Sequence, residues 1–68
     1  MTENEIKNYM MTLASGMIPL KRADKDLTTL AIGFFTAMKE LKVPKEVSKM
    51  MWTKTENAVN LMLKARSM

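Results

Sequence analysis

The chain contains neither cysteine nor histidine. Without cysteine it can form no disulfide and offers no thiolate to a zinc ion. Without histidine it lacks the commonest general base and the commonest metal ligand of proteins. It also has no glycine-rich phosphate loop, and its closely spaced acidic residues stand where helices are expected to begin. We therefore expect a protein that is not an enzyme, binds no metal or cofactor and has no small-molecule substrate.

Long apolar runs are also missing. The longest nearly apolar run, LAIGFFTAM, covers only residues 30–38 and is too short to cross a bilayer. The first residues, MTENEIKNYM, are acidic and polar, unlike a secretion signal. We expect a cytoplasmic protein, with membrane binding by the basic third helix only a minor alternative.

What is present suits one small folded domain over residues 1–68. Hydrophobic residues make up 47% of the chain, too many for a disordered segment. A chain of this size buries only about 60% of its unfolded surface, so self-association is a plausible source of extra stability. Nine methionines are an unusual number, typical of an adaptable core or an adaptable contact surface.

The net charge of +4 is unevenly placed. Residues 39–68 hold seven Lys and Arg against three Glu, which accounts for all of it. Such a basic half indicates either a surface for nucleic acid or an acidic partner, or simply a solvated helix face.

Apolar residues recur at three- and four-residue steps throughout, and no segment alternates as a strand would. The sequence predicts an all-α, three-helix, bundle-like domain with helices at about 3–15, 24–41 and 44–66. Thr2 and Glu5 form a capping-box pattern at the first start. Gly16 is expected to end this helix near Ser15, and Pro19 to lie in a connector.

The second predicted helix begins with a cap from Asp24 or Asp26. It has a broad apolar stripe, which predicts that the middle helix is the most buried of the three. The stripe consists of Leu27, Leu30, Ala31, Phe34, Met38 and Leu41. Gly33 either allows another helix to approach closely or, as we favour, is tolerated on an exposed face.

The third helix, expected to have Pro44 at its first position, has two interpretations. In the first, it is split near Trp52, because Thr53 and Glu56 repeat the capping-box pattern. The segment then superficially resembles a helix-turn-helix, with a reading helix directed at DNA. Its DNA-contacting residues would be Lys54, Thr55, Asn57, Asn60 and Lys64. A bulky Trp at the turn, where a small residue is usual, is an argument against this interpretation.

In the second interpretation, which we favour, the helix is continuous and has two apolar stripes. The wider one is the expected core face and consists of Val47, Met50, Met51, Ala58, Leu61, Met62 and Ala65. The narrower one consists of Trp52, Val59 and Leu63, and would be a partner-binding face with Lys45 and Lys49 at its basic rim. Alternatively, these three apolar residues pack inside the domain, against the first helix or the 17–23 connector.

The sequence thus predicts a small non-enzymatic regulatory protein that docks a helical surface on a protein partner or on its own copy. The alternative is a DNA-binding transcriptional regulator with a helix-turn-helix at residues 44–64.

Overall fold

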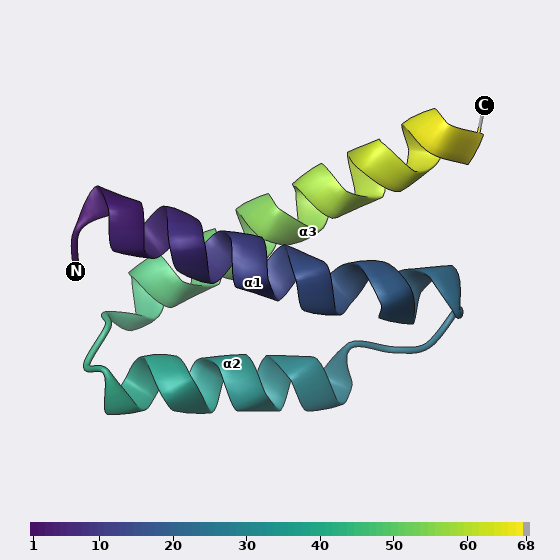
Figure 1. Ribbon diagram of the computed structural model, residues 1–68. Helices are drawn as coiled ribbons and strands as arrows, with labels where there is room; N and C mark the ends of the chain where they lie inside the picture. Colours follow the sequence, from purple (N-terminus) through teal and green to yellow (C-terminus); the bar gives the residue numbers. More distant parts are fainter. Residues whose placement is uncertain (68) are drawn as a thin grey trace.

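The computed structural model describes residues 1–67, which form three helices and no strand. Helix α1 spans Glu3–Arg22, α2 spans Thr28–Glu40 and α3 spans Lys45–Ser67 (Figure 1). The all-α three-helix fold expected from the sequence is confirmed. Helix α1 packs against α3, α2 runs back beneath α1 in the view, and the C-terminal turns of α3 extend away from the other helices (Figure 1).

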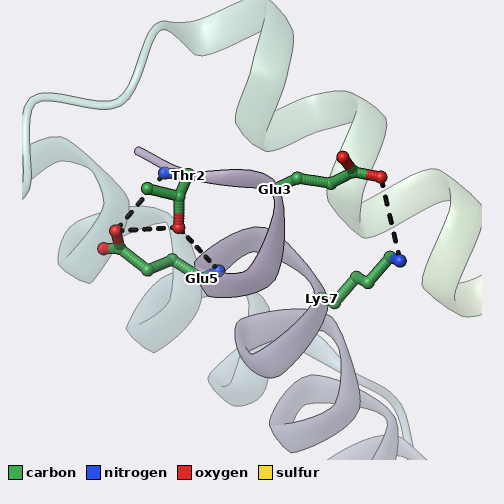
Figure 2. A network of polar contacts seen from close by, with 4 residues as sticks. All are labelled: Thr2, Glu3, Glu5 and Lys7. Carbon is green, nitrogen blue, oxygen red and sulfur yellow. Dashed lines mark hydrogen bonds and ion pairs between the residues drawn. The ribbon is translucent and has the colours of Figure 1, made fainter.

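The start of α1 is the one predicted from Thr2 and Glu5. The backbone N–H of Glu5 donates to Thr2 Oγ1 at 3.2 Å, and the backbone N–H of Thr2 donates to Glu5 Oε1 at 3.3 Å (Figure 2). Both halves of the capping box are therefore formed. One turn further on, Lys7 Nζ lies 3.7 Å from Glu3 Oε1, an exposed pair one helical turn apart (Figure 2).

The end of α1 differs from the prediction. The helix continues through Gly16 and Pro19 to Arg22, so the expected 3–15 boundary is wrong. Pro19 deprives the carbonyl of Ser15 of its helical donor, but both residues are exposed, where water can solvate that carbonyl. Met17, on the other side, is completely buried, so the packing of this last stretch offsets the cost of the proline.

Both α1 and α2 end in the same left-handed motif, with residues other than glycine at its critical position. Asp24 has φ 56° and Lys42 has φ 59°. The following N–H groups reach back to helix carbonyls, Lys25 to Leu20 at 2.9 Å and Val43 to Met38 at 3.0 Å. These are the bonds of Schellman motifs, in which glycine is the usual residue because it has no Cβ to clash.

Helix α2 begins at Thr28, four residues later than expected, because Asp24 adopts the left-handed conformation that closes α1. The capping position is held by Leu27, which makes no side-chain cap. Asp26 still contributes, since its Oδ1 accepts a hydrogen bond of 2.9 Å from the backbone N–H of Thr28. This backbone bond, together with one from the Thr28 side chain, lowers the pKa of Asp26 below its ordinary value of 3.8.

Helix α3 is continuous through residues 52–55, so the break near Trp52 that the first interpretation required does not exist. Its first hydrogen bonds go to the carbonyl of Pro44, which accepts from the N–H of Ser48 at 3.1 Å. The favoured long-helix interpretation is therefore confirmed, and the pattern at Thr53 and Glu56 lies inside a regular helix.

The core lies mainly between α1 and α3. It is built on Leu13 and Met17 of α1 and Val59 of α3, with Met51 of α3 and Met38 of α2 also buried. The expectation that the middle helix is the most buried is wrong. Only Met38 of α2 is buried, while Ile32 and the capping residue Leu41 are half or more exposed, because α2 makes fewer contacts with either of the other helices than α1 and α3 make with each other.

The buried face of α3 also differs from the expected one. Of the residues predicted for the core face, Met50 and Leu61 are exposed, as are Ala58 and Ala65. The buried face lies between the two apolar stripes of the sequence, along Ser48, Met51, Thr55 and Val59. The hydroxyl side chains of Ser48 and Thr55 therefore lie on the buried face, although neither residue belongs to an apolar stripe of the sequence.

Gly16 and Gly33 have different surroundings. A Cβ placed on Gly16 would lie 3.2 Å from Leu30 Cδ1, so this glycine permits the close approach of α1 and α2. A Cβ on Gly33 would meet nothing within 4 Å, which confirms the favoured prediction that this residue lies on an open face.

Candidate functional site

The connection between α2 and α3 borders a hollow of about 620 Å³, which we call the α2–α3 groove. Residues of both helices and of the turn between them line it: Phe35, Lys39, Lys42, Val43, Lys45, Ser48 and Lys49. Lysines and apolar or small side chains thus share one depression, and no acidic residue lines it.

The four lysines converge although they are far from contiguous in sequence. Lys39 stands in the last turn of α2, and Lys42 in the turn that follows it. Lys45 and Lys49 are four residues apart near the start of α3, so they share one side of that helix. All four are exposed, and within residues 1–67 none forms an ion pair with a carboxylate.

The turn between α2 and α3 brings the four lysines together. Lys39 contributes its carbonyl oxygen to the Schellman motif of α2, accepting from the N–H of Lys42 at 3.0 Å. Lys42 adopts the left-handed backbone conformation there, which reverses the chain within four residues. Pro44 follows and suits the start of a new helix, so both ends of the turn are built by local sequence.

The floor of the groove is held by an aromatic cluster. The Phe35 ring lies with its centroid 5.7 Å from that of Trp52, and Phe34 lies 5.9 Å from Trp52 and 5.2 Å from Phe35. These centroid distances are typical of attractive aromatic pairs. Trp52 therefore joins α3 to α2 and packs against Phe35, which lines the groove.

The structure corrects the prediction that Trp52, Val59 and Leu63 together form an exposed apolar face for a partner. Val59 is 2% exposed and belongs to the core, and Trp52 and Leu63 are half-buried against the same core. The three residues pack inside the domain because α1 covers this side of α3. Val59 therefore belongs to the interior, as the alternative considered from the sequence has it, and Trp52 and Leu63 keep only part of their surface exposed.

The predicted basic rim, by contrast, lies at the groove. Lys45 and Lys49 both line it, on the side formed by α3. They accompany Phe35 and Val43 instead of the predicted apolar anchors.

Of the five residues proposed for DNA contact, four are exposed and one is buried. Lys54, Asn57, Asn60 and Lys64 are exposed on the outward side of α3, next to the 70% exposed Leu61. Thr55 is only 3% exposed, so it is not available to a ligand. Because α3 has no turn at Trp52, the helix-turn-helix considered as the alternative over residues 44–64 is not formed.

Sequence reasoning missed Phe35, Lys39, Lys42, Val43 and Ser48 as groove residues. A partial signal was present, since the basic half of the chain begins at Lys39. The pairing of α2 and α3 around a tight turn, which brings these side chains together, cannot be read from composition.

In the described part of the chain, no helix has the length and apolar character needed to cross a membrane. Within the same residues, no three carboxylates come together as a group that would hold a metal ion. Comparison of the chain with protein-family models, with curated proteins and with solved structures finds no match.

Proposed function

We propose that the protein is a small, non-enzymatic regulatory binding protein that docks a protein partner through the α2–α3 groove. The observation that supports this proposal is the groove itself, which is lined by apolar residues and by four lysines that have no ion pair within residues 1–67. Protein interfaces commonly combine an apolar centre with a charged rim, and the groove has this composition. A protein of this kind acts by covering a site on its partner, or by bringing the partner to a new location.

Unpaired like charges favour binding over a purely structural role for the groove. Four lysines in one depression repel one another, and among the described residues they form no ion pair that would stabilise the fold. A partner of opposite charge would relieve this repulsion and would be steered towards the groove during encounter.

Photo-crosslinking in the cells that naturally express the protein tests the proposal. The photoreactive residue p-benzoylphenylalanine would replace Val43 in the groove, Asn57 on the outward side of α3, or Thr12 on α1 as a matched control. All three positions are wholly or partly accessible, so these variants are expected to fold. We expect protein adducts from position 43 and none from position 12.

Other results would change the assignment. Adducts with the protein's own chain from position 43 would make the partner a second copy. Adducts with DNA from position 57, and none with protein from position 43, would instead support the alternative function of a DNA-binding regulator, which would then use a single continuous helix.

A further inference from the structure

We infer that the α2–α3 groove binds a short acidic protein segment that inserts one apolar side chain between Phe35 and Val43. This inference rests on the proposed function and specifies the chemistry of the partner. Both the lysines and the apolar floor line the same hollow. The occupant must therefore offer carboxylates and an apolar group within a short distance of each other.

Charge complementarity identifies the polar part of the occupant. The groove is lined by Lys39, Lys42, Lys45 and Lys49, and by no acidic residue. The only ion pairs in the described part of the chain, Lys7–Glu3 and Lys21–Glu56, involve none of these four. Carboxylates of a partner would find four ammonium groups without competing internal partners.

Lys42 occupies the left-handed position of the turn between α2 and α3. A residue with a Cβ is less favourable than glycine at φ 59°, yet this position carries a lysine that lines the groove. Asp24 adopts the same conformation at the end of α1, so this conformation belongs to the helix end, and Lys42 contributes to the groove through its side chain.

The apolar floor distinguishes an acidic protein segment from a phosphate ligand. Phe35 and Val43 are half-buried, and Phe35 is held in place by its contact with Trp52. A phosphate or a nucleic-acid backbone gains little from such a floor, whereas an aliphatic or aromatic side chain would bury it.

The limited extent of the positive surface also favours a short protein segment over duplex DNA. Glu40 and Glu46 directly follow Lys39 and Lys45, and neither lines the groove. Successive helical residues lie about 100° apart, so these carboxylates point to the neighbouring faces and bound the positive field. A duplex presents phosphates along its whole length and would meet these carboxylates beyond the groove.

The experiment uses synthetic peptides without tryptophan and the emission of Trp52 as the reporter. Trp52 is the single tryptophan and contacts the floor residue Phe35, so occupation of the groove should change its emission. The probe is a fluorescein-labelled peptide of aspartates and glutamates with one central leucine, whose anisotropy gives Kd independently. Its controls replace the leucine by serine, or all acidic residues by glutamine.

We expect the acidic leucine peptide to bind, and each control peptide to bind roughly tenfold or more weakly. The double variant Lys45→Gln/Lys49→Gln should weaken binding by about tenfold at low salt, and by less at physiological salt because of screening. The matched double variant Lys54→Gln/Lys64→Gln, which removes the same charge from the outward side of α3, should bind as the wild type does. Lys42→Gly should weaken binding while raising the thermal stability of the fold.

The inference is overturned if the serine or glutamine peptide binds as well as the leucine peptide, or if both double variants lose affinity equally. Competition with duplex DNA gives a second test. The inference is also overturned if the DNA displaces the peptide when the concentration of DNA phosphate groups is no higher than that of peptide carboxylates. If the peptide experiment fails but position 43 still forms protein adducts, only the inference of an acidic segment is refuted. Failure together with the absence of such adducts would refute the proposed function as well.

Discussion

Lys21 of α1 and Glu56 of α3 form the one ion pair that joins two helices in the described part of the chain. Lys21 Nζ donates to Glu56 Oε2 at 3.1 Å, and the two side chains are only 20% and 34% exposed. Both residues line a surface hollow that the half-buried Trp52 also lines. The pair thus links the two helices that carry most of the core.

We expect this pair to contribute about 1 kcal/mol to the free energy of unfolding, because partial burial reduces screening of its charges. A double-mutant cycle with Lys21→Met and Glu56→Gln, followed by urea unfolding, measures this coupling. The exposed pair of Lys7 and Glu3 is the control and should show a smaller coupling. A coupling near zero for both pairs would contradict the prediction.

Met50 and Met51 are adjacent in sequence but differ in burial. Met51 is completely buried and Met50 is 39% exposed. We expect Met51→Ala to lower the free energy of unfolding by about 2–5 kcal/mol, because it leaves a cavity in the core. Met50→Ala should change it by no more than about 0.5 kcal/mol. Urea titrations followed by helical circular dichroism test both values, and equal losses would mean that the buried face of α3 has been assigned wrongly.

Thr55 carries a buried hydroxyl without a hydrogen-bond partner among the described residues. Its side chain is 3% exposed on the α3 face between Met51 and Val59. Replacement by valine keeps the shape and removes the unsatisfied oxygen, so we expect Thr55→Val to stabilise the fold by about 1 kcal/mol. The exposed Thr53 provides the control, and Thr53→Val should leave the melting temperature nearly unchanged. Destabilisation by Thr55→Val would indicate that the hydroxyl has a partner.

The two glycines, both within helices, should respond differently to alanine. Gly33→Ala fills open space on α2, and we expect it to raise the free energy of unfolding by about 1 kcal/mol through helix propensity. Gly16→Ala has the same propensity gain, but its Cβ would lie 3.2 Å from Leu30 Cδ1. Its net gain should therefore be smaller, since Leu30 must shift. Thermal unfolding measures the gain of each variant. An equal gain would mean that α2 or the Leu30 side chain shifts without a cost in free energy.

Several features of the fold were readable from the sequence because they depend on neighbouring residues alone. The capping box of Thr2 and Glu5 forms as predicted, and the break at Pro44 separates α2 from α3. The all-helical fold followed from apolar spacing in the same way. The position of the net positive charge in residues 39–68 was likewise evident, and this segment contains all four groove lysines, of which Lys39 is the first.

The features that were wrongly predicted depend on residues far apart in sequence. Local signals at Gly16 and Pro19 indicated a helix end, but the burial of Met17 against the core keeps α1 helical as far as Arg22. Trp52 was assigned to a free surface because the apolar stripes of α3 were considered without knowledge of where α1 lies. The free energy that decides such cases comes from tertiary packing, which single-helix patterns do not contain.

The sequence by itself determined that this protein is helical, where its first helix begins and which half carries its positive charge, since capping, apolar period and charge are local properties. Only the tertiary structure decided which face of α3 is buried and that four lysines of α2, the turn and α3 gather around Phe35 and Val43. The physical reason is that the buried face of a helix, and the side chains that converge at its end, are set by the helices packed against it.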